Sequence, residues 1–593
     1  MLPERGILKS YTSISLSKMK KICSNGWCKQ EFQIREEDVR FYDKISPVFA
    51  GKKYPIPVPT RCIDCRSAQR MTWRNERSLY GRSCAMCNRS IVCMYKPGSH
   101  ENILCEECWR SDKFDAVQHG KPYEENMPFL QQFYALLKTV PHRGLFITGE
   151  GENSEYMNWA GPCKNCYLVF NSGRLEDCYY AKGLISCTGC ADMLISQQCQ
   201  YCYNCINVGD CYNLISSRNC GQCKDSAFLF NCIGCNDCIG CTNLNHASYC
   251  ILNKKYTKEE YERRKNEMLD TGSAESMEAM RVKFEELVAK SIHRERQSIN
   301  AENSSGDFLF NTKNCFRCFE ATGAEDCAYM DCSKRCISTQ DTYGYAYESE
   351  LLYQCVGVGY SFAVAFSVQC ERCSNSMFCF QCNDAKNCFG CVGLRKAEYC
   401  VFNKQYSKEE YEALVPKIIE SLIQDGDGGA MSPNEVSGSW GEFLPAHMSF
   451  FGYNETVAQE YFPSTKEEVR SHGMNWNDYE APLPKVVKTI NAADLPDSIK
   501  DIPDDILNWA VNCEVTGKPF KIIKQELDFY RQQKLPVPRR HPDQRHRDRM
   551  ALRNPRKLWE RNCAKCKKGI TTSYAPDRPE IVYCESCYLA AVY

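Results

Sequence analysis

Residues 220–250 have the sequence CGQCKDSAFLFNCIGCNDCIGCTNLNHASYC, and residues 370–400 have the sequence CERCSNSMFCFQCNDAKNCFGCVGLRKAEYC. The second stretch repeats six cysteines of the first at an offset of 150 residues, and the agreement continues upstream at an offset of 149. Downstream, Thr257–Glu260 and Ser407–Glu410 are matching capping boxes, and each predicts a helix that begins directly after its copy. The chain therefore contains a duplicated cysteine-rich domain, here called B and B′.

The two ends of the chain form a second duplicated pair, here called A and A′, at an offset of 479 residues. Both copies close with two CxxC pairs that lie 17 residues apart. Both copies also carry four arginines upstream of these pairs, which are Arg66, Arg70, Arg74 and Arg77 in A and Arg545, Arg549, Arg553 and Arg556 in A′. The predicted order is A–B–B′–A′.

The composition limits the class of protein. The 593 residues include 74 Lys+Arg and 74 Asp+Glu, so bulk charge does not attract nucleic acid. No apolar run approaches 18 residues, and the first 21 residues lack the apolar core of a secretory signal. We therefore expect a cytoplasmic protein without a membrane span. In a reducing compartment, 43 cysteines are expected to be metal ligands or buried thiols rather than disulfides.

The CxxC pairs predict zinc sites, because two such pairs bring four thiolates to about 2.3 Å from one Zn²⁺. A has a second set of four cysteines, whereas A′ retains only Cys513 there, with His541 and Gln544 in place of Cys62 and Cys65. We expect about three zinc ions per chain, all structural because no coordination position stays open. The predicted ligand sets are Cys23, Cys28, Cys62 and Cys65; Cys84, Cys87, Cys105 and Cys108; and Cys563, Cys566, Cys584 and Cys587.

The cysteines of B have a different pattern. Cys178, Cys199, Cys220 and Cys241 recur at 21-residue intervals between short β-prone pieces and Gly, Asn or Asp turns. A period of about 20 residues is typical of a parallel β-solenoid, whose interior would hold the cysteines as small apolar residues. The alternative is an array of metal sites. B′ replaces Cys190, Cys211 and Cys235 by Thr339, Ser361 and Ala385, which favours the packed ladder.

The predicted fold is mainly β with α: duplicated cysteine-ladder β-solenoids flanked by duplicated treble-clef or zinc-ribbon modules, with helical connectors. The predicted boundaries are an N-terminal tail (1–22), A (23–112), a connector (113–160), B (161–255), a helical connector (256–304), B′ (305–403), a helix (404–425), a linker or irregular segment (426–505) and A′ (506–593).

Several stretches carry a resemblance to a known family. They are Cys62–Arg66, Arg74–Arg77, Phe451–Pro463, Ser573–Glu580 and Val582–Tyr588. The layout resembles large cysteine-rich zinc-ribbon proteins of candidate-phyla-radiation bacteria, over nearly the full chain. This resemblance implies zinc binding and implies no activity.

The arginines suggest a function. In A they are spaced i, i+4, i+8 and i+11, which places them on one helical face, and residues 531–570 hold 14 Lys/Arg against three acids. Such stripes beside rigid zinc modules predict binding of RNA, DNA or a ribonucleoprotein through phosphate contacts. One alternative is that the stripes dock on the acidic B domains within the chain. A second is a scaffold or adaptor that binds proteins and no nucleic acid.

No catalytic signature supports an enzyme. The chain lacks an H-E-x-x-H motif, a phosphate-binding loop and a nucleophile elbow. One half of a deaminase signature occurs at Pro162–Cys166, but the conceivable other half, Cys105 with Glu107, belongs to a CxxC pair. We therefore predict a protein that is not an enzyme and that binds nucleic acid or protein partners but no membrane.

Overall fold

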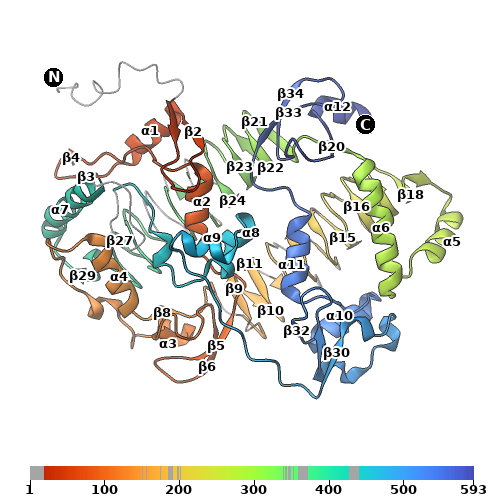
Figure 1. Cartoon of the computed structure of the whole chain (residues 1–593), viewed down its shortest axis with the longest axis horizontal. Helices are drawn as coiled ribbons and strands as arrows, with labels where there is room; N and C mark the ends of the chain where they lie inside the picture. The colour runs from red at the N-terminus through yellow and green to blue at the C-terminus, as the bar shows by residue number, and fades with distance from the viewer. Residues whose placement is uncertain are drawn as a thin grey trace. The chain divides into compact units, whose positions relative to one another are not determined.

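A computed structural model describes residues 19–149, 151–154, 156–173, 175–183, 191–196, 199–200, 202–334, 336–337, 340, 343–344, 349–350, 353–357, 372–426 and 440–593 (Figure 1). Most of the predicted N-terminal tail lies outside these residues, as do Cys190, Thr339, Ser361 and Cys370. Helices and many small sheets occur together, which confirms the mixed β and α content. No helix in the described ranges is long and apolar enough to cross a membrane.

The chain divides into two compact units, and each unit combines modules that are distant in sequence. Unit 1 comprises Met1–Ile91, Tyr95–Gly144 and Ser298–Asn477, and it contains A together with B′. Unit 2 comprises Val92–Met94, Leu145–Gln297 and Asp478–Tyr593, and it contains B together with A′. Each terminal module therefore packs with the cysteine-rich domain that is farther from it along the chain.

B and B′ are ladders of short parallel strands. In B these are β9 (Met157–Ala160), β10 (Cys163–Lys164), β11 (Val169–Ser172), β12 (Leu175–Glu176), β13 (Leu194–Ser196), β14 (Ile206–Val208), β15 (Tyr212–Ile215), β16 (Lys224–Phe230), β17 (Asn236–Thr242) and β18 (Ser248–Ile251), followed by antiparallel β19 (Lys254–Lys255). In B′ they are β21 (Ser298–Glu302), β22 (Gly306–Lys313), β23 (Cys318–Thr322), β24 (Asp331–Lys334), β25 (Cys336–Ile337), β26 (Ser349–Glu350), β27 (Lys386–Phe389) and β28 (Glu398–Val401), followed by antiparallel β29 (Lys404–Gln405).

The structural repeat is twelve residues, not the predicted period of about 20. Tyr212 pairs with Lys224, and Lys224 pairs with Asn236, so one coil follows the next after twelve residues. Within each coil, a left-handed residue recurs at every third position, as at Asn213, Ser216, Asn219 and Gln222. Cysteines 21 residues apart both fall on inward positions because 21, like 12, is a multiple of three.

The triplet explains both the asparagines and the cysteines. Asn and Asp tolerate the left-handed conformation better than most residues, and their side chains also link neighbouring coils, as when Asn213 donates to Asp225 Oδ1 at 2.8 Å. The residue after each left-handed position points inward. In one coil two of the inward positions are cysteines, Cys220 and Cys223. In the next coil four inward positions are cysteines, namely Cys232, Cys235, Cys238 and Cys241.

The inward thiols are hydrogen-bond donors as well as small core residues. Cys220 Sγ donates to the carbonyl of Arg218 at 3.2 Å, and Ser226 Oγ makes the equivalent bond to Lys224 at 2.6 Å. Burial raises the pKa of Cys220 well above its ordinary value, so its thiol keeps the proton that it donates. Where thiols lie side by side, Cys163 donates to Cys166, which lowers the pKa of Cys166 to about 4.

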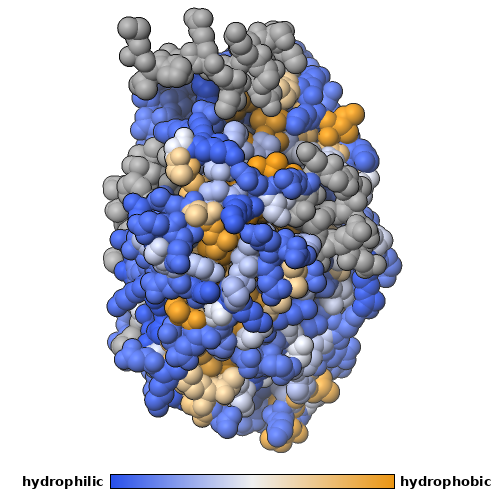
Figure 2. Space-filling model, turned by 90° about the vertical axis from the view of Figure 1, so that its left-hand side faces the viewer, coloured by the Kyte–Doolittle hydropathy of each residue, from blue (hydrophilic) through white to orange (hydrophobic). Residues whose placement is uncertain are grey.

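Helices cover the ladders. In unit 2, α5 (Lys258–Met268) begins at Thr257, whose side chain accepts from Glu260 N as the capping box predicts, and α6 (Ala274–Lys290) follows. Met280 and Phe284 of α6 pack with Phe228 and Ile239 of the ladder, and α6 runs alongside β16 in Figure 1. In unit 1, α7 (Lys408–Gly426) and α4 (Phe129–Thr139) share the core of B′. On the face in Figure 2, coloured hydrophobic residues form small groups separated by hydrophilic ones.

The terminal modules are built from short hairpins and helices. A contains β1 (Met19–Ile22), β2 (Glu31–Ile34), α1 (Glu36–Ile45), β3 (Val48–Phe49), β4 (Lys52–Lys53), α2 (Ile63–Met71), β5 (Tyr80–Ser83), β6 (Ser90–Cys93), β7 (Ile103–Leu104) and α3 (Glu106–Arg110), with β8 (His142–Arg143) pairing to β7. A′ contains β30 (Lys488–Asn491), β31 (Trp509–Asn512), β32 (Pro519–Phe520), α10 (Lys524–Gln533), α11 (Pro542–Ala551), β33 (Trp559–Asn562), β34 (Gly569–Thr572), β35 (Ile581–Tyr583) and α12 (Glu585–Val592).

The predicted linker or irregular segment, 426–505, contains buried residues in the parts that the structure describes. Its described part in unit 1 buries Trp440, Phe443 and Met448 in the hydrophobic core. α8 (Val457–Tyr461) begins where the N–H of Val457 donates to the carbonyl of Arg74 at 3.0 Å. Residues of the unit 1 part pack individually on A, as where Trp440 Nε1 donates to the carbonyl of Pro55 and Ser449 Oγ to that of Thr72.

We expect Cys220→Ala to destabilise the B ladder by about 1 kcal/mol, because it removes a small buried side chain and its hydrogen bond. Cys220→Ser should cost less, since serine already makes this bond at Ser217 and Ser226. Native-state hydrogen exchange of β16 measures both effects. Loss of bound metal from the Cys220→Ala protein would contradict the packing role of this thiol.

Candidate metal centres

Three groups of four cysteines are arranged to hold a metal ion. In each group the four sulfur atoms lie within 4.8 Å of one another. A tetrahedral ion with metal–sulfur bonds of about 2.3 Å requires sulfur–sulfur distances of about 3.8 Å. One sulfur–sulfur distance in each centre is 3.7 Å (Cys28 to Cys62), 3.9 Å (Cys87 to Cys105) and 3.7 Å (Cys566 to Cys584). The groups contain the twelve predicted ligands, and they are the only such groups found among the described residues.

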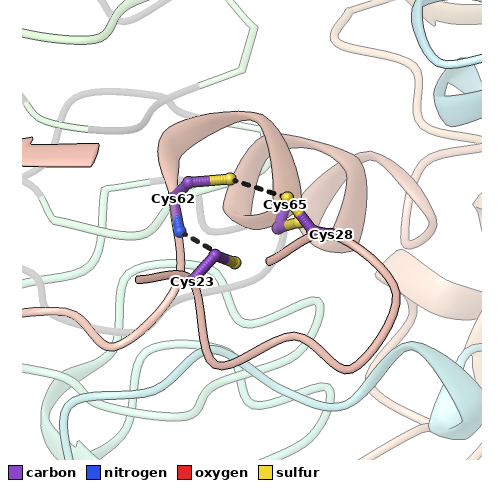
Figure 3. A group of neighbouring side chains, drawn as sticks. All are labelled: Cys23, Cys28, Cys62 and Cys65. Atoms are coloured by element: carbon purple, nitrogen blue, oxygen red, sulfur yellow. Dashed lines mark hydrogen bonds between the residues drawn. The ribbon is translucent and has the colours of Figure 1, made fainter. Parts of the chain in front are cut away.

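The first centre joins a hairpin to a helix (Figure 3). Cys23 and Cys28 lie in the turn between β1 and β2, whereas Cys62 is the N-cap of α2 and Cys65 lies in its first turn. The N–H of Cys62 donates to Cys23 Sγ at 3.3 Å, and Asn25 Nδ2 donates to Cys65 Sγ at 3.2 Å. A metal ion here would fix the start of α2.

The other two centres are copies of each other. In A, Cys84 and Cys87 lie in the turn between β5 and β6, and Cys105 and Cys108 lie at the start of α3. In A′, Cys563 and Cys566 lie between β33 and β34, and Cys584 and Cys587 lie at the start of α12. The N–H of the third cysteine donates to the sulfur of the first at 3.3 Å in both modules.

Backbone donors prepare these thiols for a cation. Burial alone would raise the pKa of Cys84, but N–H groups of Cys105, Cys87 and Met86 lower it to about 6. N–H groups of Cys566, Cys584 and Lys565 lower the pKa of Cys563 to about 6 against the same effect of burial. Thiolates are the form that binds metal, so these positions suit a soft or borderline divalent ion.

An ion pair repeats beside each of these two centres. In A, Glu106 follows the third ligand and accepts from Arg143 Nε at 2.6 Å and from Arg143 Nη2 at 2.7 Å. In A′, Glu585 accepts from Arg294 Nη2 at 2.5 Å. Arg143 and Arg294 lie on β8 and on β20 (Ile292–Arg294), which pair in parallel with β7 and β35. Each centre is thereby fastened to the strand that leads into a ladder.

A fourth knuckle, in A′, lacks most of its ligands. The N–H of Cys513 donates to the carbonyl of Lys518 at 3.1 Å, as that of Cys563 does to Lys568 at 2.8 Å, which places Thr516 at the second ligand position. His541 is the N-cap of α11 and accepts from the N–H of Asp543 at 3.1 Å, and Gln544 donates to Asp548 at 2.7 Å. Polar contacts within the protein therefore hold the start of α11.

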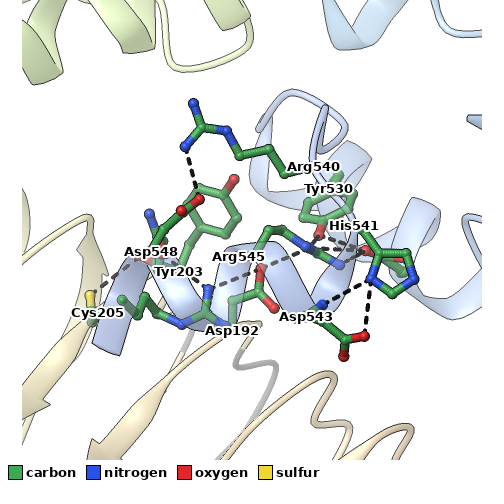
Figure 4. Close-up of polar contacts among 12 residues, drawn as sticks. Asp192, Tyr203, Cys205, Tyr530, Arg540, His541, Asp543, Arg545 and Asp548 are labelled. Atoms are coloured by element: carbon green, nitrogen blue, oxygen red, sulfur yellow. Dashed lines mark hydrogen bonds and ion pairs between the residues drawn. The ribbon is translucent and has the colours of Figure 1, made fainter. Parts of the chain in front are cut away.

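The arginines of A′ are buried against the B ladder (Figure 4). Arg545 Nη1 lies 2.7 Å from Asp192 Oδ2, and its guanidinium lies 4.4 Å from the ring centre of Tyr180. Arg549 Nη1 lies 3.4 Å from Asp192 Oδ2 and 3.3 Å from Asn204 Oδ1. Tyr180, Asp192 and Asn204 are left-handed residues twelve positions apart, so they form one column along the ladder.

Glu526 of α10 completes this contact. It accepts from the hydroxyls of Tyr180 at 2.7 Å and Tyr530 at 2.8 Å, and it lies 3.3 Å from Arg545 Nη2. Burial raises the pKa of Tyr180 and Tyr530 well above the ordinary value, so both hydroxyls remain donors. Burial also raises the pKa of Glu526, which Arg545 and the two hydroxyls oppose. The side chains of Tyr180, Asp192, Glu526 and Arg545 are buried, and their charges are paired within the unit.

A meets the B′ ladder with the same set of groups. Tyr329 donates to Asp38 Oδ2 at 2.9 Å, and Arg66 donates to the hydroxyl of Tyr42 at 3.2 Å with its guanidinium 5.7 Å from the ring of Tyr329. Arg74 Nη1 donates to the carbonyl of Val356 at 3.1 Å and occupies space that a side chain at Gly344 would fill. Asp341, the repeat partner of Asp192, lies outside the described residues.

These contacts correct the prediction of phosphate-binding stripes. The helices end at Met71 and Ala551, so Arg74, Arg77, Arg553 and Arg556 lie beyond them rather than on one helical face. Arg66, Arg70, Arg74, Arg545 and Arg549 are buried. The positions of these arginines agree with the alternative prediction that they dock within the chain. They do not support nucleic-acid binding.

The comparisons with known proteins give no relative. No family model matches the chain, and neither a curated protein nor a solved structure matches it.

Sequence reasoning missed the groups that receive the arginines. Tyr180 and Tyr329 are related by the same 149-residue offset as the two ladders, and Asp38–Tyr42 matches Glu526–Tyr530 as an acid followed by tyrosine four residues later. The signal was therefore present in the duplication. To recognise these pairs in the sequence, one must already know that A packs with B′ and that A′ packs with B.

Removing metal should affect the two docked helices differently. In A, the N-cap and first turn of α2 are metal ligands, whereas polar contacts hold the start of α11 in A′. Chelation should therefore abolish hydrogen-exchange protection in residues 63–71 and preserve it in residues 542–551. Restoring the metal should restore protection. Equal loss of protection in both helices would contradict this assignment.

Proposed function

We propose that this protein is a non-enzymatic scaffold whose terminal modules are zinc ribbons with structural zinc and whose B domains are β-solenoids. The observation that carries this proposal is the duplicated contact between each module and a ladder. In both units a carboxylate, two tyrosines and an arginine meet in the interior. Within each unit the module and the ladder are thus joined by buried polar contacts, which supports a structural role for these side chains.

Zinc is the metal that best suits the three centres. Four thiolates in a tetrahedral arrangement select zinc or iron–sulfur chemistry over oxygen-preferring ions. All four positions of each centre are protein ligands, so the metal would stabilise the fold and activate no water. No disulfide joins the cysteines that the structure describes, which supports a reducing, cytoplasmic location.

A scaffold is favoured over a nucleic-acid-binding protein by the burial of the arginines. A guanidinium that already pairs with Asp192 and stacks on Tyr180 cannot also release counterions from a phosphate backbone. The ladders are regular stacks of coils, and repeat architectures of this kind are typical of proteins that bind other proteins.

The metal content of the purified chain tests the zinc assignment. Elemental analysis should give three zinc ions per chain, matching the three tetra-cysteine groups. Cys87→Ser in A and Cys566→Ser in A′ should each remove one zinc ion. A count above six would indicate metal in the ladders, and a count of zero would contradict the proposal.

Binding assays test the choice between scaffold and nucleic-acid-binding protein. The zinc-loaded chain should show no salt-sensitive affinity for RNA or DNA of mixed sequence, because phosphate contacts make binding fall steeply with salt. An affinity that decreases with salt and disappears in Arg545→Gln would overturn the scaffold assignment.

A further inference from the structure

The knuckle tips of A and A′ differ although their folds match. The tip is the turn that contains the second ligand, residues 85–89 in A and 564–568 in A′, together with the residue before the fourth ligand. In A the matched residues are Met86, Asn88, Arg89 and Glu107, and in A′ they are Lys565, Lys567, Lys568 and Ser586. The tip thereby changes from a net charge of zero to a net charge of +3.

In A the tip is neutralised internally. Arg89 Nη2 lies 2.5 Å from Glu107 Oε2, and both side chains are exposed. In A′ the position of Glu107 is taken by Ser586, whose hydroxyl lies 3.3 Å from Cys584 Sγ. The neighbouring acid, Glu585, is paired with Arg294.

The three lysines of A′ are therefore exposed charges with no acidic partner in the described part of the chain. All three residues are exposed, and none forms an ion pair with a residue that the structure describes. Lys567 donates to the carbonyl of Ala564 at 3.1 Å, which keeps its ammonium group at the tip. Lys567 also has φ +65°, a left-handed conformation that the matched Asn88 adopts more readily than lysine does. The fold alone would favour asparagine at this position.

Apolar residues replace polar ones beside the same tip. Ile581 and Leu589 are 40% and 39% exposed, and they stand where A has Asn102 and Arg110. Ile581 adjoins Val582, whose carbonyl accepts from the N–H of Ala564 at 2.9 Å. Tyr593, one turn after Leu589 in α12, is 66% exposed. A surface that combines unpaired lysines with exposed apolar side chains suits a carboxylate-rich peptide better than a phosphate backbone.

We infer that the knuckle tip of A′ docks an acidic, partly apolar segment of a partner protein. This inference rests on the scaffold function and assigns it a binding surface. Lys565 and Lys568 pair with the carboxylates of the segment, and its apolar side chains contact Ile581, Leu589 and Tyr593. The knuckle metal holds the tip rigid, so the lysines are positioned before binding.

Module A supplies the matched variants that test the inference. Lys565→Met, Lys567→Asn and Ser586→Glu together give A′ three of the four tip residues of A and its net charge of zero, with Lys568 in place of Arg89. Met86→Lys, Asn88→Lys and Glu107→Ser make the reciprocal change in A. Both variants leave the twelve cysteine ligands intact, so three zinc ions should remain bound.

The probe is a labelled synthetic peptide of alternating Glu and Leu, added to the zinc-loaded full chain. We expect salt-sensitive binding to the wild-type chain, at least tenfold weaker binding to the A′ variant, and additional binding to the A variant. Peptide binding that is absent from the wild-type chain, or equal in the wild-type chain and the A′ variant, would overturn the inference.

Two other occupants are separate outcomes. Tighter binding of an RNA of mixed sequence with the same number of charges would assign the tip to nucleic acid. Concentration-dependent self-association that the A′ variant abolishes would assign it to a second copy of the chain. Either result would overturn the acidic-segment assignment. Because all variants keep three zinc ions, a failure here is distinguishable from a failure of the zinc scaffold, which would appear as altered metal content.

Discussion

One turn of an α-helix rises 5.4 Å, and neighbouring strands of a sheet lie about 4.8 Å apart. Arginines four residues apart on α11 therefore meet successive coils of the B ladder, with Asp192 between Arg545 and Arg549. The left-handed corner residues supply the receiving column, because they recur every twelve residues. The burial of charge makes this match strict, since an arginine out of register would be left unpaired in a dry interior.

Metal ions and ladders solve complementary problems. A and A′ are assembled from short hairpins and helices, and a metal ion in each tetra-cysteine centre would hold these elements together. The ladders need no ion, because thiols such as Cys220 fill the interior and donate to carbonyl groups. The same residue type therefore serves two purposes. Backbone donors lower the pKa of Cys84 to about 6, whereas burial raises that of Cys220.

Much of this arrangement was predictable from the sequence. The spacing of the CxxC pairs, with Cys23 and Cys28, predicted the twelve cysteines that the structure brings together, and the repeats predicted the duplicated modules and the capped helices after each ladder. The twelve-residue coil was not recognised because cysteines occupy only some of the inward positions, and their 21-residue recurrence obscured the triplet. The role of the arginines was mispredicted because charge spacing along a helix is the same for a phosphate surface and for a buried column. The two roles can be told apart only when it is known that A packs with B′ and that A′ packs with B.

The central claim is that Arg545 and Asp192 hold A′ on its ladder. A double-mutant cycle with Arg545→Gln and Asp192→Asn measures their coupling, and native-state hydrogen exchange of α11 reports the free energy of opening. Each single variant leaves one buried polar partner unsatisfied, so we predict a coupling energy of about 2 kcal/mol or more. Strictly additive effects of the two substitutions would contradict the account.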